Sequence, residues 1–380
     1  MLTVMLTAVV AFAITFLAIP AIMKVASEKK LYDLPDERKL HTKPIASLGG
    51  VGIFIGFFLA ILLTVSGKQA EEFQFYFASA IVIFFLGLKD DILIISATKK
   101  FLGQLAAAAI IIHLGNVRIE SMHGVMGLER LPEVWSYLIT YVTIIVIVNA
   151  YNLIDGVDGL AGSLGMVTSS VFGIYFFMAG MPMYSMLAFA MSGSLAAFLF
   201  FNLNPAKIFM GDSGSLLLGL LNAILVIKFI TIADNPASAM PLASAVAIGI
   251  AILIVPLLDT LRVFSIRLSR GRSPFSPDRN HIHHLLLDRG LNHSQVTMTC
   301  VGMKLSFIAM SYFGRTLGPT ILISLMLVAS LAMIGALILF KKPVSKLVIA
   351  SAFQHNKPEP SVQPATKVVA LKTEAAVAEN

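Results

Sequence analysis

Charged residues are scarce in this chain. Asp, Glu, Lys and Arg together make up 13% of its 380 residues, whereas hydrophobic residues make up 57%. An ordinary soluble domain carries a charged share of roughly a quarter, so the composition excludes that class of protein. The sequence instead predicts an all-α polytopic membrane protein, because helices satisfy their own backbone hydrogen bonds inside a bilayer.

Cysteine and internal repeats are also lacking. The single cysteine, Cys300, excludes an intramolecular disulfide framework and a multi-cysteine zinc site. The absence of an internal repeat weakens a transporter built from inverted halves. The net charge of +7 is scattered over several short polar loops. This scatter favours anionic headgroups and a phosphorylated substrate, and it argues against nucleic acid as a partner.

Long apolar runs divide the chain into spans. Crossing a hydrocarbon core takes about 20 apolar residues. About eleven segments qualify, near 3–23, 48–66, 73–89, 101–114, 134–149, 160–179, 183–201, 213–233, 240–261, 296–313 and 317–340. We therefore expect a membrane domain over residues 1–344. Residues 345–380 lack apolar periodicity, which is typical of a flexible tail.

The Lys and Arg residues predict the orientation of the spans. Six of them lie between the first two spans, whereas the next loop holds only Lys68. Basic loops face the cytoplasm, so the 24–47 loop is expected there, with the N-terminus outside and the C-terminal tail in the cytoplasm. Alternation then places every acidic motif described below on the cytoplasmic face. Lys228 and Lys304 fall within spans and have no evident role in the sequence.

Two acidic motifs stand at the ends of apolar runs. Asp90 and Asp91 follow one run, and Asp212 lies in Phe209-Met-Gly-Asp-Ser-Gly214 before another. A charge at the bilayer centre costs about 2.5–3.5 kcal/mol, so carboxylates at span ends call for a functional explanation. They suit a divalent cation or a proton acceptor. A solvated loop pair and a helix cap are the structural alternatives.

The segment from Asn149 to Gly159 is the most specific motif. Asn149, Asn152, Asp155 and Asp158 recur every three or four residues and would share one face if the segment were helical. Oxygen ligands of this kind suit Mg²⁺, which combines one or two carboxylates with substrate phosphate. An ordinary turn between helices is the alternative, because Asn, Asp and Gly dominate turns.

The loop 262–293 combines arginines with His281, His283 and His284. Arginine binds phosphate bidentately, and imidazole can donate to phosphate or to a sugar hydroxyl. A structural zinc site is the competing interpretation, weakened because no further Cys or His pattern completes a tetrahedral set. His41 is a lesser candidate. Four other histidines are treated as incidental: His113, His123, His293 and His355.

Taken in order, these motifs resemble one family. The matching features are Arg38-Lys-x-His41 with Pro44 and Gly49-Gly50, Asp90-Asp91 with Lys100 and Gln104, Asn149 to Gly159, Phe209-x-Gly-Asp-x-Gly214, and His281-x-His-His284. They resemble the polyprenyl-phosphate N-acetylhexosamine-1-phosphate transferases over nearly all of residues 3–340. The stretch 273–284 is similar to the N-acetylglucosamine branch, which starts O-antigen, teichoic acid or related glycans.

The resemblance implies a bacterial inner-membrane enzyme that acts at the cytoplasmic face. It would transfer a sugar 1-phosphate from a UDP-sugar to undecaprenyl phosphate and release UMP, with Mg²⁺ or Mn²⁺ as cofactor. A homodimer is left open. The roles implied are metal binding for Asp212 and Asn152, catalysis for Asp90, Asp91, Asp155, Asp158, His281, His283 and His284, and substrate binding for Arg38, His41, Lys100, Asn149, Asn152 and Arg279.

Two other functions are weighed against this one. The phospho-MurNAc-pentapeptide branch of peptidoglycan synthesis shares the plan but carries a different histidine-loop pattern. A transporter would place ionisable groups near span centres and interrupt its hydrophobic segments. Here the acids gather at span ends on one side, which favours the enzyme.

Overall fold

The computed structural model describes residues 2–33, 45–65, 71–271 and 281–339. Arg38, His41 and Arg279, together with the expected tail at 345–380, lie outside the described residues. The helices are α1 (Leu2–Lys29), α2 (Gly49–Thr64), α3 (Glu71–Ile92), α4 (Ala97–Ala109), η2 (Ile110–Leu114), α5 (Glu133–Ile154), α6 (Leu160–Met178), α7 (Pro182–Asn202), α8 (Gly211–Ala233), α9 (Ala245–Ile252), α10 (Ile254–Ser269), α11 (Ile282–Leu287), α12 (His293–Phe313), η3 (Arg315–Leu317) and α13 (Pro319–Leu339).

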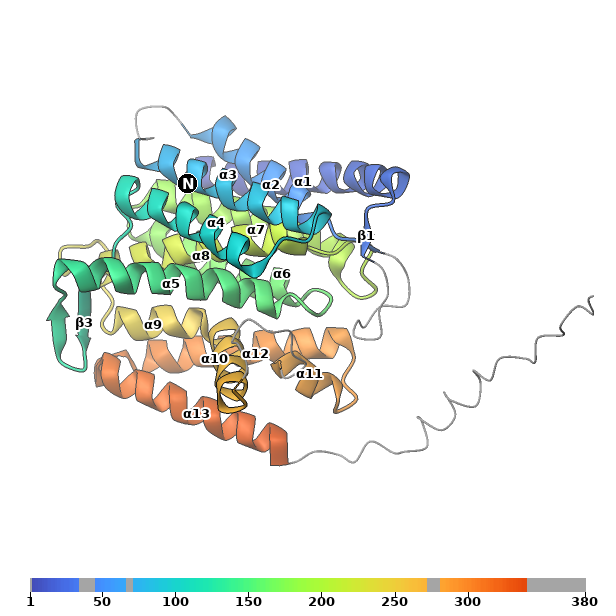
Figure 1. Ribbon diagram of the computed structural model, residues 1–380. Helices are drawn as coiled ribbons and strands as arrows, with labels where there is room; N and C mark the ends of the chain where they lie inside the picture. The colour runs from blue at the N-terminus through green and yellow to red at the C-terminus, as the bar shows by residue number, and fades with distance from the viewer. Residues whose placement is uncertain (1, 34–44, 66–70, 272–280, 340–380) are drawn as a thin grey trace, which may run out of the picture. The chain divides into compact units, whose positions relative to one another are not determined.

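Among the described residues, two short pairs of strands accompany the helices. Strand β1 (Tyr32–Asp33) pairs antiparallel with β2 (Ile45–Ala46), and β3 (Ser121–Val125) pairs antiparallel with β4 (Leu128–Arg130). Figure 1 shows β1 and α11 at one end of the long helices and β3 at the opposite end. The described part of the chain is therefore a helical bundle with a small hairpin at each end.

Every expected apolar segment is helical over most of its length. Seven described helices are long and apolar enough to cross a membrane, or eight if the bent pair α9 and α10 counts as one span. The expected continuous span over 240–261 is wrong in form, because α9 begins only at Ala245 and α10 follows it at an angle of 76°. Interrupted membrane helices occur where the backbone is buried in protein or lines a cavity.

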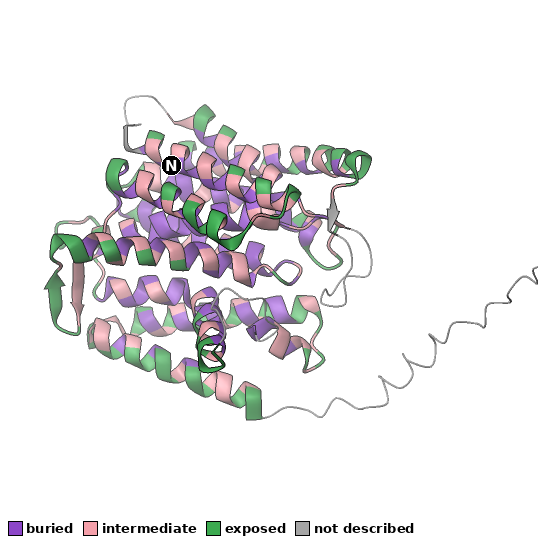
Figure 2. Ribbon diagram, viewed as in Figure 1, coloured by how far each residue is buried: buried purple, intermediate pink, exposed green. Residues whose placement is uncertain are grey.

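Helix α8 occupies the centre of the bundle, and the peripheral helices cover it (Figure 2). In its most apolar stretch 78% of the residues are buried, against 17% for α13. A helix that is apolar on every side suits such a position. Glycines let neighbours approach it closely: a Cβ on Gly50 would lie 2.1 Å from Gly214 N, and one on Gly219 would lie 2.6 Å from Val148 Cα. Small residues at helix interfaces are typical of membrane proteins.

The two lysines that the sequence left without a role have partners. Lys304 on α12 is buried and donates to the carbonyl oxygen of Leu164 and to Oγ1 of Thr168, both on α6. Lys228 on α8 donates to the carbonyl oxygen of Asn116 over 3.1 Å. Both therefore hold segments of the bundle together through hydrogen bonds, which the buried ammonium group of Lys304 requires.

Candidate active site

Lys100 and Asp212 lie at the centre of a polar cluster at one end of the bundle. The Lys100 ammonium on α4 donates to Asp212 at the start of α8, to Asp90 at 3.1 Å and to the amide oxygen of Asn152 at 3.1 Å. Asn152 Nδ2 in turn donates to Asp212 Oδ1 at 2.7 Å. Helices α3, α4, α5 and α8 thus meet at one point, although their residues are far apart in sequence.

Asp91 holds the start of α8 in place. Its two carboxylate oxygens accept the backbone N–H groups of Asp212 at 2.6 Å and of Ser213 at 3.0 Å. These N–H groups have no partner within their own helix, so Asp91 acts as a cap supplied by another helix. Gly211 is required beside it, because its φ is +71° and a Cβ there would lie 2.7 Å from Asp91 Oδ1. Asp212 itself caps nothing, which leaves its carboxylate for the cluster.

A pocket of about 500 Å³ opens onto this cluster. Its lining residues are Lys30, Leu31, Ser47, Leu48, Asp90, Asp91, Ile92, Ile94 and Asp212. Lys30 adds a positive charge to a wall whose other charged residues are acidic, and it takes a left-handed φ of +55° after the end of α1. From the sequence, Lys30 is interpreted only as one of the basic residues of a cytoplasmic loop, because no motif near it indicates that it lines a pocket.

The segment from Asn149 to Gly159 is not one helical face. Helix α5 ends at Ile154, so Asn149 and Asn152 lie in its last turns, whereas Asp155 and Asp158 belong to the following turn. Asn149 pairs with Gln104 on α4, with Nδ2 donating to Oε1 over 2.8 Å. That pair fixes α4 against α5 and gives Asn149 a packing role.

The acidic turn contains two differently placed carboxylates. Asp155 is half-buried, and burial together with the charges of Asp212, Asp91 and Asp158 raises its pKa to about 8. Asp158 Oδ2 accepts the backbone N–H of Ala206 at 3.2 Å. Asp155 is therefore close enough to the acids of the cluster to be affected by their charge. Asp158 instead connects the turn to the segment before α8.

The histidine cluster lies against this acidic turn. His283 Nε2 would be 2.8 Å from a Cβ on Gly156, so only glycine allows the approach. Burial lowers the pKa of His283 to about 3, so its ring is neutral at physiological pH. The rings of His281 and His283 stack with centroids 5.2 Å apart, and His284 lies 4.4 Å from His283. The structure thus brings the histidine loop and the acids together.

Three of the histidines treated as incidental have polar partners in the structure, namely His293, His123 and His113, and His355 lies outside the described residues. His293 Nδ1 lies 3.2 Å from Asp158 Oδ2, and His123 Nδ1 lies 2.6 Å from Asp234 Oδ2 at the opposite end of the bundle. His113 lies 3.0 Å from the Tyr141 hydroxyl. Each pairing joins segments far apart in sequence, so no local pattern could have shown it.

Asp259 is a buried carboxylate that none of the sequence motifs includes. It lies on α10 and accepts from His281 Nδ1 at 2.7 Å and from the backbone N–H of Ile282 at 2.5 Å. The rule that marks the other acids, a carboxylate at the end of an apolar run, applies equally to Asp259. Asp259, His281 and His283 also offer ligand atoms within 4.8 Å of one another.

The polar cluster fits a hard divalent cation. Asp212 and Asn152 present a carboxylate and an amide, and Asp90 adds a second carboxylate that also pairs with Lys100. Magnesium prefers oxygen ligands of this type and few protein carboxylates. The pKa of Asp155 is raised by burial and then by the charges of neighbouring carboxylates, so a bound cation would offset part of this repulsion.

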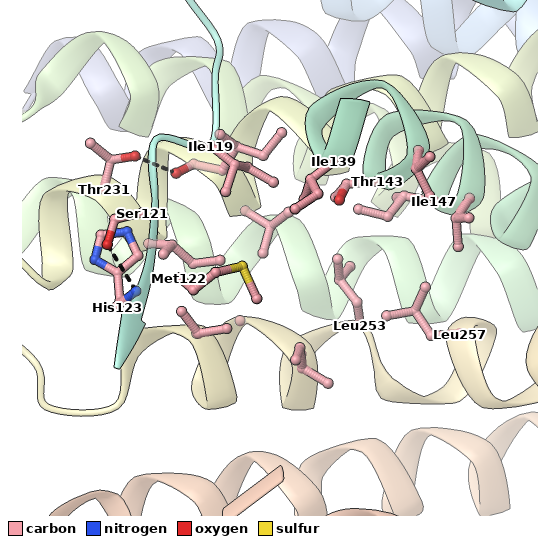
Figure 3. Close-up of a pocket in the computed structure, with 18 residues that line it drawn as sticks. Ile119, Ser121, Met122, His123, Ile139, Thr143, Ile147, Thr231, Leu253 and Leu257 are labelled. Carbon is pink, nitrogen blue, oxygen red and sulfur yellow. Dashed lines mark hydrogen bonds between the residues drawn. The ribbon is translucent and has the colours of Figure 1, made fainter. Parts of the chain in front are cut away.

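A second cavity is apolar and lies between α5, α8 and the α9–α10 bend (Figure 3). It has a volume of about 320 Å³ and extends from His123 in the β3 hairpin to Leu257 on α10. Ile139 and Ile147 of α5 line one side, and Leu253 lines the bend. The cavity therefore reaches the helix that carries Asp259, two residues beyond Leu257.

Comparison with known proteins places the chain in a family. A probable undecaprenyl-phosphate N-acetylglucosaminyl 1-phosphate transferase of Bacillus subtilis (strain 168) is 32% identical over 343 residues, which cover 87% of this chain and 92% of the relative. The profile of glycosyl transferase family 4 matches residues 73–230. The chain belongs to this family. It is a member of the polyprenyl-phosphate N-acetylhexosamine-1-phosphate transferases, as the motifs predicted.

Other relatives of this family member carry related names. An undecaprenyl-phosphate alpha-N-acetylglucosaminyl 1-phosphate transferase of Yersinia pestis is 30% identical and covers 78% of this chain and 80% of its own. A decaprenyl-phosphate N-acetylglucosaminephosphotransferase of Mycobacterium leprae (strain TN) is 33% identical and covers 77% and 79%. The family match spans α3 to α8, the part of the bundle that builds the polar cluster.

Proposed function

We propose that this polyprenyl-phosphate sugar-1-phosphate transferase moves N-acetylglucosamine 1-phosphate from UDP-N-acetylglucosamine to undecaprenyl phosphate and releases UMP. The observation that carries the proposal is the cluster beside the histidine loop, in which Asp90 and Asp212 line one pocket and Lys100 pairs with both of them. Attack by a phosphate oxygen on the sugar-bearing phosphorus brings several negative charges together. A site for that reaction needs fixed positive charge and a metal.

The residues of the polar cluster and its pocket would have separate roles in this phosphoryl transfer. Asp212 and Asn152 would hold Mg²⁺, which supplies positive charge against the donor diphosphate when bound. Lys100, which pairs with Asp212 and donates to Asn152, adds a second positive charge. Asp90 lines the pocket and can accept a proton from the acceptor phosphate. Lys30 stands in the same wall to attract that phosphate.

The apolar cavity is a candidate site for the polyprenyl chain of the acceptor. Of its 18 lining residues, 13 are Ile, Val, Leu or Met, which suits isoprenoid units better than a polar ligand. It reaches α10 at Leu257, so one end lies on the helix that carries Asp259. We propose that part of the polyprenyl chain occupies this cavity while the phosphate stays at the polar end of the bundle.

The test offers purified protein a panel of UDP-sugars with undecaprenyl phosphate and identifies the lipid product by mass spectrometry. We expect an undecaprenyl-diphospho-N-acetylglucosamine product and stoichiometric UMP, with both lost in EDTA and restored by Mg²⁺. Transfer from UDP-MurNAc-pentapeptide alone would place the protein in the peptidoglycan branch. Near-normal turnover in EDTA would end the metal assignment.

A further inference from the structure

Asp259 is a carboxylate whose burial demands an explanation. Its side chain is buried, and it lies on α10 six residues beyond Leu253 at the 76° bend. A buried carboxylate is unfavourable unless nearby donors compensate for the lost water. Asp259 has two such donors in the described chain, the ring nitrogen Nδ1 of His281 and the backbone N–H of Ile282. Both belong to the start of the histidine loop.

The contact fixes which nitrogen of His281 carries a proton. An ionised carboxylate only accepts hydrogen bonds, so Nδ1, 2.7 Å from Asp259 Oδ2, must be protonated. Nδ1 is therefore occupied, and Nε2 is the ring nitrogen that remains to contact a ligand. In histidine, the hydrogen bond that one ring nitrogen makes commonly sets which of the two nitrogens carries the proton.

The ring of His281 is connected to the acidic turn through His283. Its ring stacks on His283 with an interplanar angle of 6°, and His283 packs against Gly156 in the acidic turn. A carboxylate that merely capped α11 would need only the Ile282 N–H. The additional bond to the His281 ring aligns a residue that lies one stacked ring away from the acids.

We propose that Asp259 is a positioning residue, which acts through His281 by holding the proton on Nδ1 so that Nε2 contacts the sugar-nucleotide diphosphate donor. This inference rests on the proposed function for the identity of that donor. It assigns no direct contact between Asp259 and substrate. Its consequence is that the charge and both acceptor oxygens of Asp259 matter for donor binding.

The substitution Asp259→Asn tests the tautomer directly. An amide has one acceptor oxygen, and the fixed backbone N–H of Ile282 requires it. The amide NH₂ group then faces His281 Nδ1, which must accept, so the proton moves to Nε2. Nitrogen-15 spectra of labelled histidine should show this exchange at His281, assigned by the signal missing from His281→Ala. Asp259→Glu keeps both acceptor oxygens and should retain the original tautomer.

The kinetic expectation is specific to the donor. In Asp259→Asn the KM for the UDP-sugar should rise by about 10- to 100-fold, the range typical for loss of a group that orients a catalytic or ligating residue. The KM for undecaprenyl phosphate and the Mg²⁺ requirement should not change. Asp288→Asn, an exposed carboxylate at the end of the same α11, is the matched control and should behave as wild type.

A double variant decides whether Asp259 acts through His281. When Asp259→Asn is added to His281→Ala, kcat/KM should fall no further than in His281→Ala alone. Multiplied losses, or an unchanged tautomer with wild-type KM in Asp259→Asn, would overturn the inference. Stoichiometric zinc that disappears in both single variants would also overturn it, in favour of a metal site. If wild-type protein transfers no sugar phosphate, the proposed function fails, yet the spectra still test the contact.

Discussion

At the scale of single residues, Asp90 and Asp91 are neighbours with different partners. Asp91 accepts two backbone N–H groups at the start of α8, whereas Asp90 accepts from Lys100 and from the backbone of Ile95. In Asp91→Asn one N–H would lose its acceptor, which should lower the free energy of unfolding by roughly 1–3 kcal/mol. Thermal unfolding in detergent measures this loss.

Asp90→Asn is the matched comparison. It should lower turnover by about two to four decades if Asp90 is the proton acceptor. Its free energy of unfolding should change less than that of Asp91→Asn, because Asp90 does not cap the start of α8. Wild-type turnover in Asp90→Asn, or equal stability of the two variants, would show that the pair does not divide its roles in this way.

Asp212 offers the sharpest test of the metal assignment. Asp212→Asn should abolish turnover and leave the fold intact, since an amide cannot supply the anionic oxygen that Mg²⁺ prefers. Its neighbour Asn152 can still donate to the remaining oxygen. The measurement is turnover across a Mg²⁺ and Mn²⁺ series beside the unfolding temperature. A variant that binds Mg²⁺ and turns over like wild type contradicts the assignment.

Asp155 should make stability depend on pH. Burial and nearby carboxylates raise its pKa to about 8, whereas an unfolded Asp titrates near its usual value of about 3.9. Between these values the folded protein binds the extra proton, so the free energy of unfolding should fall as pH rises from about 4 to about 8. Unfolding temperatures in EDTA measure this slope. The slope should flatten in Asp155→Asn, and an equally steep slope there would contradict the cause given.

At the scale of helices, close packing of α3 on α8 sets the distance between the acids. A Cβ on Gly87 would lie 2.5 Å from the carbonyl oxygen of Asp212 and 2.6 Å from Ser213 Cα. Gly87→Ala should therefore push α3 away, break the Asp91 cap and lower turnover by at least roughly tenfold. Because backbone atoms oppose the methyl group, no side chain can move aside to relieve the clash.

Gly302→Ala on α12 is the control for this substitution. Among the described residues no neighbouring atom lies within 4 Å of the place its methyl group would take, and alanine is favourable inside a helix. It should keep wild-type turnover and stability. If Gly87→Ala also does so, the approach of the two helices does not determine the geometry of the acids.

At the scale of the whole molecule, the polar cluster must face one side of the membrane. In a Cys300→Ala background, a cysteine at Lys207 should resist an impermeant thiol reagent in intact cells, whereas one at Glu129 should react. Both positions are exposed. Lys207 precedes Ile208, which pairs with Ala46 of β2, and Glu129 lies in β4 of the opposite hairpin; the basic loops predict which end is cytoplasmic. Reaction at Lys207 from outside, with cells proved intact, would separate the cluster from the cytoplasmic UDP-sugar.

Local patterns in the sequence determined the class of fold and the residues of interest. Apolar runs of span length placed a helix at every expected segment, and acids at the ends of those runs marked Asp90, Asp91 and Asp212. These features are readable because the bilayer imposes a length and a polarity on each segment independently of the others. The order of the motifs also identified the family correctly.

The contacts between these residues were decided only by tertiary structure. Three of these contacts join segments that are distant in sequence: Asp91 with the start of α8, His283 with Gly156, and His281 with Asp259. The bend before α10 is likewise absent from the apolar pattern. No periodicity records them, because they depend on how closely glycines let helices approach and on which buried donor finds which acceptor. The sequence alone determined which groups could carry the chemistry, and packing determined which of them meet.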